Sequence, residues 1–584
     1  MLLMNDDQLN GVIQSWRDTK EEDLKPEDYQ QFKNFGSFCL TEGDSQQLLA
    51  FLRDDSNQDI VRYMGCVLLD PLVNEVVKRK KNHDDCQAAI THLTMTCSPE
   101  NVLHCWLKIL ADIDPGAISE IIIAILPHLQ TVLFKLDERK AVSVGLALSA
   151  LQKQLSRLPV PYTEQQEEDD ELGLCRCCTA LALFMEPFVE EAKKKDDPCV
   201  GEDDLKIELL KFCMKSLRDP LLEADLNRER QSALWLFAVE ITAILHAIRE
   251  SLSELIFFSS LRKSTLMDTS VFKESRACLA YLLFVQLLAM DSFPAVFSPV
   301  FILQCNMEHI SQLLSSKKES HLLKGLALLE KSLEKVEDDC LPVGLLEQKS
   351  FHSSLQNLQC ILTDCPMLHL RKSGLKILQL FINKLDLEAR HKFFRYMLKT
   401  SHHAGLESYI VNNIRGQVEL SMKQGNANKW FLGNELISLL ELVLRLPECA
   451  ETDLLTNMDR IMESLNLLRY MFLRDKELRR NTFVWDELIR IKDEYLKLLR
   501  VCISMSRAYY SAELKALRED QRLQAKEARD AARSNRLIKS MTVKPEKMAN
   551  MPPEVQHQVL QIALVTFDLM ESLIIRIEEI AEKK

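Results

Sequence analysis

Glycine and proline are scarce in this sequence. Of its 584 residues, 15 are Gly and 18 are Pro, which is roughly 3% each against about 7% and 5% in average proteins. Tight turns and strand-rich folds need these residues, whereas helix interiors avoid them. Apolar residues make up 47% of the chain. We therefore predict an all-α protein with a large core.

The sequence also lacks the motifs of the common catalytic and nucleotide-binding sites. It contains no G-x-x-x-x-G-K-S/T, G-x-G-x-x-G, H-E-x-x-H or G-x-S-x-G pattern. A phosphate-cradling loop is hard to build with so few glycines. The net charge of −13, from 73 basic and 86 acidic side chains, opposes nucleic-acid binding. We predict that the protein is not an enzyme, has no cofactor and binds no nucleic acid.

From the sequence we expect neither a signal peptide nor a bilayer-spanning run. The start, MLLMNDDQLNG, has neither a basic segment nor a long apolar one. The longest apolar run, 277–290, contains Gln286 and is too short to cross a bilayer. We expect a cytoplasmic protein without a membrane partner. Its 17 Cys residues would then stay reduced and mostly act as small core residues.

One apolar pattern occurs twice, 49 positions apart, as GLALLEKSLEKVE at 325–337 and GLKILQLFINKLD at 374–386. Steps of three and four keep its apolar residues on one face of a helix. The expected buried stripes are Leu326, Leu329, Leu333 and Val336 in the first copy, and Leu375, Leu378, Ile382 and Leu385 in the second. Repeats of about 40–50 residues are typical of HEAT and armadillo proteins. The predicted architecture is a HEAT-like helical-repeat solenoid.

Two regions are predicted within this solenoid. Residues 1–320 form an N-terminal helical-repeat region with exposed acidic linkers near 164–171 and 190–206, and residues 321–584 form a C-terminal HEAT-like partner-binding region. Prolines, Pro127 and Pro187 among them, are expected near breaks between helices. The apolar stretch 119–136 is predicted to be an inner helix.

The C-terminal end is predicted to contain two further helical segments. Residues 513–540 alternate charge with Ala and Leu, which indicates a solvated helix or a helix-prone disordered arm. Pro552 and Pro553 are placed to start the last helix. This last helix should cap the end of the solenoid. Its expected core stripe comprises Val559, Ile562, Leu569, Leu573 and Ile580.

Two cysteine groups raise the question of a metal site. Cys175, Cys177 and Cys178 have no second ligand pair nearby, so small residues at a helix start are the favoured interpretation. Another group, C-x4-C-x3-H, comprises Cys360, Cys365 and His369, with His402 or His403 as a possible fourth ligand. Core leucines surround that group, and the pair His402–His403 reads as a loop between helices. We predict no bound metal.

The stretch NANKWFLGNELISLLELVLRLPE at 426–448 suggests a binding surface. Trp430 stands at a loop-to-helix corner, where it either staples the helix start or forms an exposed anchor. In the next predicted helix, 452–472, the expected core stripe is Leu455, Met458, Met462, Leu465 and Leu468. The opposite face should show Arg460, Asn466, Arg469 and Tyr470. Because Trp, Tyr and Arg dominate interface hot spots, the predicted partner contacts are Lys429, Trp430, Arg460, Arg469 and Tyr470.

Several stretches resemble the glomulin family. They are LPVPYT (158–163), GLCRCC (173–178), GLALSALQKQLS (145–156), NKWF (428–431), LPECAETDLLTNMDRIMESLNLLRY (446–470) and NMPPEVQHQVL (550–560). The resemblance implies an all-helical HEAT-like protein whose C-terminal repeats bind the RING-box subunit of cullin–RING ubiquitin ligases. They would cover the docking surface of the ubiquitin-conjugating enzyme. It also implies links to an FK506-binding immunophilin, to the hepatocyte growth factor receptor and to vasculature development.

Two other classes of function fit the same pattern. A general HEAT-type scaffold or a transport-receptor-like protein would show the same periodicity and acidity while binding other protein partners. A helical enzyme is disfavoured, because no convergent set of catalytic side chains is recognisable.

The five predicted contacts rest on residue type and expected exposure, and are not transferred from the family.

Overall fold

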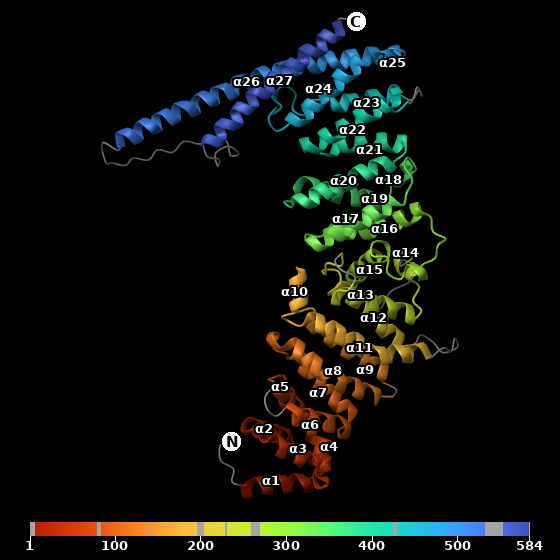
Figure 1. Ribbon diagram of the computed structural model, residues 1–584, viewed down its shortest axis with the longest axis vertical. Coiled ribbons are helices and arrows are strands. Elements are labelled where there is room, and N and C mark those ends of the chain that lie inside the picture. Colours follow the sequence, from red (N-terminus) through yellow and green to blue (C-terminus); the bar gives the residue numbers. More distant parts are fainter. Residues whose placement is uncertain are drawn as a thin grey trace. The chain divides into compact units, whose positions relative to one another are not determined.

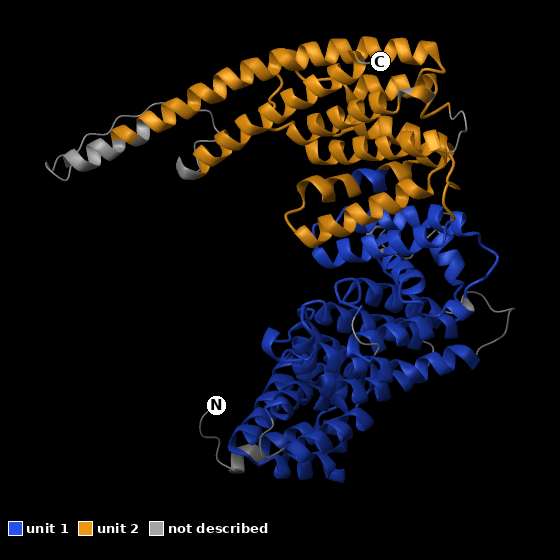
Figure 2. Cartoon of the chain, turned by 45° about the horizontal axis from the view of Figure 1, so that its top comes forward, with its two compact units in different colours: residues 1–336, 353–357 blue, residues 337–352, 358–584 orange. Residues whose placement is uncertain are grey.

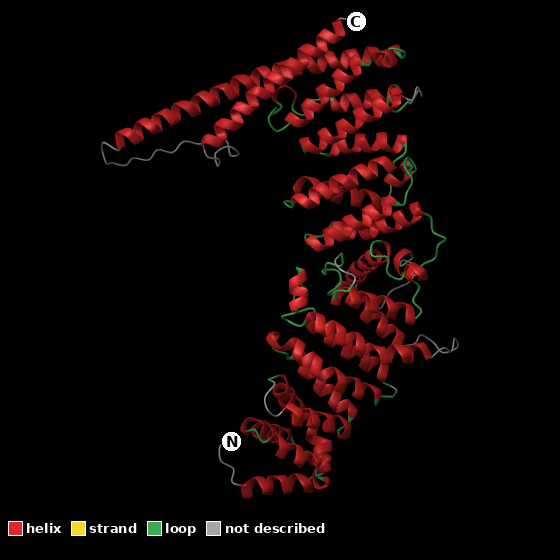
Figure 3. Cartoon of the chain, in the orientation of Figure 1, coloured by secondary structure: helices red, strands yellow, loops and turns green. Residues whose placement is uncertain are grey.

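The computed structural model describes residues 6–78, 83–137, 139–194, 204–227, 231–258, 269–423, 429–531 and 553–582. In these ranges the regular secondary structure is helical and no residue lies in a strand (Figure 3). One isolated parallel bridge pairs Leu341 with Leu385. The prediction of an all-α fold is confirmed.

The chain divides into two compact units (Figure 2). Unit 1 comprises residues 1–336 and 353–357, and unit 2 comprises residues 337–352 and 358–584. The sequence analysis had placed a division at residue 320. Helix α19 (Lys349–Asp364) contributes residues to both units.

The remaining helices follow in chain order. Unit 1 contains α1 (Asp6–Asp18), α2 (Pro26–Glu42), α3 (Ser45–Arg53), α4 (Gln58–Met64), α5 (Leu69–Val77), α6 (His83–Thr96), α7 (Pro99–Ala111), α8 (Ile118–Phe134), α9 (Lys140–Leu155), α10 (Glu164–Asp169), α11 (Leu174–Lys194), α12 (Asp204–Arg218), α13 (Ala233–Ala247), α14 (Leu252–Phe257), α15 (Thr269–Phe284), α16 (Pro299–Leu314) and α17 (Glu319–Glu334). Unit 2 contains α18 (Val343–Leu346), α20 (Leu368–Lys384), α21 (Leu387–Thr400), α22 (Ala404–Lys423), α23 (Asn434–Val443), α24 (Met458–Leu473), α25 (Asp475–Leu478), α26 (Thr482–Ala531) and α27 (Pro553–Glu582). Short 3-10 helices include η3 (Gly65–Leu68) and η6 (Cys449–Glu451).

Within each unit, helices pack mainly on helices close to them in the chain (Figure 1). In unit 1, α8 contacts α7, α9 and α11, and α16 contacts α15 and α17. In unit 2, α21 contacts α22 and α23, and α24 contacts α22 and α27. Such stacking of neighbours is the architecture of helical-repeat proteins. The predicted HEAT-like solenoid is confirmed.

The repeated glycines mark the points where two helices approach closely. A Cβ atom on Gly325 of α17 would lie 2.7 Å from Leu314 Cδ2 of α16, and one on Gly374 of α20 would lie 3.2 Å from Leu362 Cδ2 of α19. The two copies of the pattern are therefore equivalent helices, each packed on the helix before it. All the predicted stripe residues are buried except Leu375, which is 37% exposed. That exception is a correction: in the second copy Ile377 is buried in place of Leu375, next to Leu378.

Two prolines expected near breaks between helices lie inside helices instead. Pro127 is within α8 and Pro187 within α11. A proline removes one backbone hydrogen bond, which packing and side-chain donors can offset. The Gln130 amide of α8 donates to the carbonyl of Phe184 at 2.9 Å, in the turn before Pro187. The prediction of an inner helix at 119–136 is confirmed by the buried face of α8.

The acidic segment 164–171 is exposed, as expected, but it is not an unstructured linker. It forms α10, in which Thr163 and Gln166 make a reciprocal capping box. The Glu167 carboxylate accepts a hydrogen bond from the backbone N–H of Leu234 at 3.1 Å. The Asp170 carboxylate accepts from the first N–H groups of α11. In the second expected linker, 190–194 and 204–206 are helical, and 195–203 lie outside the described residues.

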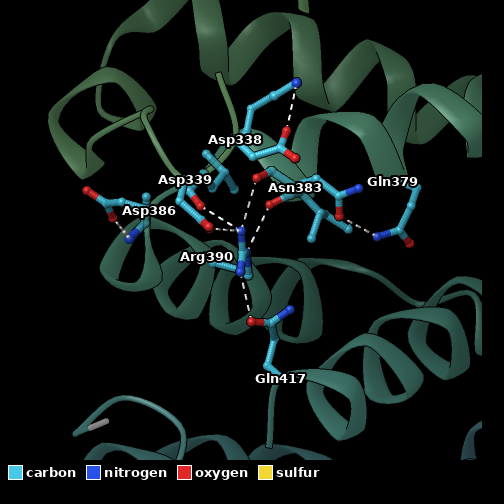
Figure 4. Close-up of polar contacts among 11 residues, drawn as sticks. Asp338, Asp339, Gln379, Asn383, Asp386, Arg390 and Gln417 are labelled. Atoms are coloured by element: carbon cyan, nitrogen blue, oxygen red, sulfur yellow. Dashed lines mark hydrogen bonds and ion pairs between the residues drawn. The ribbon is translucent and has the colours of Figure 1, made fainter. Parts of the chain in front are cut away.

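Arg390 of α21 forms hydrogen bonds that hold the first residues of unit 2 in place (Figure 4). Its buried guanidinium donates to five acceptors: Asp339 Oδ1 at 2.5 Å, Gln417 Oε1 at 2.8 Å, and the carbonyls of Ile382, Asn383 and Leu385 at 3.0, 3.1 and 2.8 Å. Backbone bonds between Leu341 and the turn after α20 run alongside. The segment 338–341 is thereby held against the turn between α20 and α21.

The last two helices form an antiparallel pair, seen side by side in Figures 1 and 2. Arg500 of α26 forms an ion pair with Glu578 of α27 at 2.5 Å, and Arg507, further along α26, forms one with Asp568 at 2.7 Å. Because the partner on α27 moves backward as α26 advances, the two helices are antiparallel. The expectation of a helix is confirmed for residues 513–531, and 532–540 lie outside the described residues.

The core stripe of α27 differs from the expected one. The buried residues are Leu560, Ala563, Phe567, Met570, Ile574, Ile577 and Ile580. Ile562 and Leu569 were expected in this stripe, but they are 59% and 53% exposed. The helix carries a second apolar face, so the sequence pattern alone selects the wrong one. We call the exposed residues Val555, Ile562, Val565 and Leu569 the α27 stripe.

The sequence analysis expected no bilayer-spanning run, but within the described residues two segments, Pro115–Phe134 and Val555–Glu582, are long and apolar enough to cross a membrane by length and composition. The first contains α8, which packs on α5, α7, α9 and α11, and the second lies in α27, which packs on α24 and α26. Core helices of repeat proteins have the same composition, and helix packing accounts for the buried part of each segment.

Candidate protein-binding surface

The corner before α23 is anchored by Phe431. Its ring is fully buried and lies 6.2 Å from the Phe394 ring and 5.9 Å from His391, both on α21. Trp430 is half-buried, with its ring 5.2 Å from His391. Gly433 permits the turn, because a Cβ atom there would lie 2.7 Å from the Lys429 carbonyl oxygen. Phe431 thus takes the staple position that was considered for Trp430.

Lys429 and His391 both lie next to Trp430. The exposed Lys429 ammonium lies 4.8 Å from the centre of the Trp430 ring, a cation–π arrangement. His391 Nε2 donates to the carbonyl of Glu435 at 3.0 Å, and burial lowers the His391 pKa. The imidazole is therefore neutral at pH 7 and offers Trp430 a flat uncharged support. Trp430 keeps part of its ring open to solvent.

Tyr470 and Arg469 stand at the C-terminal end of α24, next to the C-terminal end of α22. Arg469 is exposed and Tyr470 is half-buried. Burial and the nearby Glu419 raise the Tyr470 pKa, opposed by Arg474 and Lys423. Arg474 and Lys423 therefore lie close enough to the Tyr470 phenol for their charges to act on it. Glu419 pairs with Lys423 at 2.7 Å.

The start of α26 adds more basic and aromatic side chains at the same end. The Arg479 guanidinium lies 4.7 Å from the centre of the Trp485 ring, and Trp485 lies 5.3 Å from Phe472 of α24. Arg480, Phe483 and Leu473 are exposed. Asn481 Nδ2 donates to Asn434 Oδ1 at 3.4 Å, which joins this segment to the start of α23.

These elements together form a surface that we call the basic rim. It comprises the exposed bases Lys423, Lys429, Arg469, Arg474, Arg479 and Arg480, with Trp430, Tyr470, Leu473 and Phe483 between them. In a chain of net charge −13, this is a local concentration of positive charge. Arg, Trp and Tyr are the residue types that dominate protein–protein hot spots. The rim can therefore bind an acidic protein surface that offers an apolar pocket.

A family model described as an uncharacterised protein family, YAP/Alf4/glomulin, matches residues 1–563. This chain belongs to that family. Human glomulin is 41% identical over 594 residues, an alignment that covers 99% of this chain and 98% of the relative. Mouse glomulin is 41% identical over 592 residues with the same coverage. The resemblance to the glomulin family seen in the sequence is confirmed.

A solved structure aligns with the chain over 98% of both molecules. Its title is "Circular tandem repeat protein with novel repeat topology and enhanced subunit contact surfaces". The identity is 12% and the TM-score is 0.19, so this likeness supports no conclusion about fold or function.

Arg460, a predicted partner contact of this family member, does not lie on the rim. It is only 8% exposed, near the N-terminal end of α24, and pairs with Glu407 at 2.7 Å. It also donates to the carbonyls of Leu442 and Arg445. The expectation that Arg460 is exposed is wrong, because the orphan carbonyls at the end of α23 need a buried donor. The other four predicted contacts, Lys429, Trp430, Arg469 and Tyr470, come together at the rim.

The core stripe of α24 is also displaced from the expected one. Leu465 and Leu468 are buried as predicted, but Leu455, Met458 and Met462 are only half-buried. Ile461, Ser464, Leu467, Met471 and Phe472 are buried in their place. The helix begins at Met458, after a turn, rather than at residue 452. The face that it buries is set by contacts with both α22 and α27.

The sequence analysis missed the contribution of residues 473–483 to the rim. The run LRDKELRRNTF contains four bases, and its exposed apolar ends are Leu473 and Phe483. A signal was present, since a basic run in an acidic chain marks a possible interaction site. The run follows Tyr470 in the chain, but only the folded chain shows that it lies close to the start of α23.

The possible metal ligands lie in ordinary structural positions. Cys175, Cys177 and Cys178 are buried at the start of α11, where burial raises the pKa of Cys175 and of Cys177 to about 12. Cys360 and His369 are exposed, and His402 and His403 form the loop between α21 and α22. Among the described residues, no three His, Cys, Asp or Glu side chains lie close enough together to hold a metal ion.

Proposed function

We propose that this protein is a non-catalytic inhibitor of cullin–RING ubiquitin ligases. It binds the RING-box subunit together with its cullin through unit 2 and masks the surface on which the ubiquitin-conjugating enzyme docks. The observation that carries the proposal is the basic rim, in a chain 41% identical to human glomulin over nearly its whole length. We place this activity in the cytoplasm. An FK506-binding immunophilin and the hepatocyte growth factor receptor are further proposed partners, and vasculature development is the proposed biological context.

The mechanism is steric competition. A RING domain offers its conjugating enzyme a compact patch, and transient interfaces of this kind are small. A rigid helical-repeat surface that covers the same patch excludes the enzyme without any chemistry. Trp430, supported by His391, and Tyr470 supply partly exposed aromatic surface. The surrounding Arg and Lys side chains steer an acidic partner into place.

A purified ubiquitin-chain assay tests the proposal. The full chain is titrated against a cullin–RING ligase at several concentrations of conjugating enzyme. Inhibition is expected, and excess conjugating enzyme should relieve it, because the two compete for one surface. If the intact protein in excess over the ligase leaves chain synthesis unchanged, the proposal fails.

Charge-reversal variants test whether the rim is the contact surface. Lys429→Glu combined with Arg469→Glu should weaken binding to the ligase by roughly tenfold or more, with little change in stability, because both side chains are exposed. Lys153→Glu makes the same kind of change on an exposed residue of α9 and should leave binding unchanged. If the rim variant inhibits as well as the unmodified chain, the contact lies elsewhere. The α27 stripe is then the surface to test, with Ile562→Asp.

The alternative is a general HEAT-type scaffold or a transport-receptor-like protein that binds other partners. Its basis is that a helical-repeat fold alone does not specify a partner. A pull-down from cell lysate distinguishes the two hypotheses, ligase inhibitor and general scaffold. Cullins and the RING-box subunit support the inhibitor, whereas transport cargo without cullins supports the scaffold.

A further inference from the structure

A pocket opens in unit 1 where two helices end and a third begins. It has a volume of about 320 Å³ and is lined by the last residues of α12 and of α16, the turn after α12, the first residues of α17 and one residue of α15. Leu222 and Leu313, both buried, form an apolar part of its wall. This volume is at the small end of the range for ligand sites. The pocket lies within unit 1, whereas the basic rim lies in unit 2.

His321 lines the pocket and carries a buried ring nitrogen with an unused hydrogen-bonding capacity. The residue is only 9% exposed, and among the described residues its Nε2 atom has no hydrogen-bond partner. Burial, followed by the charges of Lys318 and Lys324, lowers the pKa of His321 to about 4. The ring is therefore neutral at pH 7, and with its proton on Nδ1 it offers Nε2 as an acceptor. A ligand donor that reaches Nε2 would satisfy an atom that is unfavourable to leave unpaired.

The charges around the pocket favour a cation. Two bases and three carboxylates line it: Arg218, Lys318, Asp219, Glu223 and Glu274. One negative charge is therefore in excess. The C-terminal ends of α12 and α16 add the partial negative charge of helix carbonyls, against the partial positive charge of one N-terminal end, that of α17. An anion would meet net repulsion at this site.

Asp219 is the carboxylate that a bound cation would compensate. Arg218 Nε lies 2.8 Å from Glu274 Oε2 but 3.7 Å from Asp219 Oδ2. Lys318 pairs with Glu223. Both bases are thus engaged mainly by the other two carboxylates. Burial raises the pKa of Asp219 and outweighs the opposing effect of Arg218, so a further positive charge beside Asp219 would be stabilising.

The walls of the pocket are held in place by contacts within unit 1. The ion pair between Lys318 and Glu223 joins the turn after α12 to the start of α17. The buried ammonium of Lys324 donates to the carbonyl of Ala224 in the same turn, and it lies 5.4 Å from the centre of the Tyr281 ring on α15. Helix α15 packs on α12, α16 and α17. The site is therefore formed before a ligand arrives, which reduces the ordering cost of binding.

We propose that this pocket binds an organic cation with a guanidinium group, through the Asp219 carboxylate and His321 Nε2. A guanidinium holds its N–H donors in one plane, so one edge can pair with a carboxylate while another N–H reaches a second acceptor. Its flat faces are weakly hydrated and suit a wall that contains leucines. The group can belong to a free small molecule or to an arginine side chain of another protein. The proposal does not depend on the ligase-binding surface of unit 2.

Calorimetric titration of the full chain tests the proposal with two probes. n-Butylguanidinium represents a free small molecule, and the peptide acetyl-Ala-Arg-Ala-amide represents an arginine side chain of a protein. At least one should bind saturably with a dissociation constant of about 1 mM or tighter. Binding of the peptide alone identifies a protein side chain as the ligand, and tighter binding of n-butylguanidinium identifies a small molecule. The neutral counterparts, n-butylurea and the citrulline peptide, should not bind. If neither cation binds, or if the neutral counterparts bind equally well, the proposal is overturned.

Hydrogen exchange of the unmodified chain shows whether the cation binds at this pocket. The bound probe should slow exchange in peptides that cover 219–224 and 315–321, and protection confined to other segments would refute the assignment.

Variants identify the two contacts. Asp219→Asn should weaken binding by about tenfold or more, and His321→Leu by about threefold or more. Asp112→Asn is the matched control, because Asp112 is exposed and directly follows α7 as Asp219 follows α12; its affinity should be unchanged. If Asp219→Asn keeps its helicity and binds the probe as tightly as the unmodified chain, Asp219 is not the contact and the proposal fails.

Discussion

Removing the Arg390 side chain should loosen the start of unit 2. The guanidinium is almost fully buried and serves five acceptors, three of which are backbone carbonyls. In Arg390→Ala these carbonyls and Gln417 lose a charged donor. Hydrogen bonds to charged groups contribute about 1.5–3 kcal/mol each, and a buried acceptor left without a donor costs about 1–3 kcal/mol. Summed over the three carbonyls and Gln417, we expect a loss of about 3–5 kcal/mol in local stability.

The carboxylate of this cluster should matter much less than the guanidinium. The side chain of Asp339 is 63% exposed, and without it Arg390 still donates to Gln417 and to three backbone carbonyls. We therefore expect Asp339→Ala to cost about 1 kcal/mol or less. Arg390→Lys keeps the positive charge but has too few donors for five acceptors. Its effect should fall between those of the two alanine variants.

Native-state hydrogen exchange is the suitable assay, because a chain of several units does not unfold in one step. The measured quantity is the exchange rate of the Leu341 and Asp386 amide hydrogens. These amides donate to the carbonyls of Lys384 and Leu341 at 2.8 and 3.0 Å, respectively. A loss of about 3–5 kcal/mol lowers their protection by roughly two to four orders of magnitude. Lys153→Ala, on an exposed site of α9, is the control. If Arg390→Ala changes protection no more than this control, the cluster does not hold the segment.

Two further predictions concern pH and the Trp430 corner. His309 is buried, and its burial, with a smaller effect of the nearby Arg276, lowers its pKa to about 3. In the unfolded chain the pKa of this side chain is about 6.5. The neutral imidazole therefore stabilises the fold fully above that pH, and this stabilisation is lost as the pH falls toward 3. Unfolding by urea at about pH 7.5 and about pH 5 should show a loss of about 2 kcal/mol in the unmodified chain that is absent in His309→Gln, and equal pH dependence in both would contradict this. Phe431→Ala should destabilise unit 2 by about 3–5 kcal/mol, whereas Trp430→Ala should cost about 1–2 kcal/mol and mainly weaken ligase binding. Thermal unfolding and the inhibition assay separate the two roles, and the reverse ranking of stabilities would show that Trp430 is the staple.

Four features follow from the sequence alone because they depend on local chemistry. Few glycines and prolines, together with apolar steps of three and four, specify helices wherever they occur. The twin patterns at 325–337 and 374–386 identify equivalent helices before any contact is known. Family membership is likewise carried by residue identity, as in the block at 446–470. The hot-spot residue types at 429–430 and 469–470 point toward the surface where the folded chain gathers them.

Tertiary structure decides which of several possible faces a helix buries. In α27 two apolar faces compete, and the one that meets α26 and α24 is buried, which leaves Ile562 and Leu569 outside. Arg460 looks like a surface residue in the sequence, but the carbonyls at the end of α23 and the carboxylate of Glu407 draw it inward. The same holds for the place of residues 473–483 beside the start of α23. Each depends on which distant segment packs alongside, and hydrophobic periodicity within one helix contains no information about that neighbour.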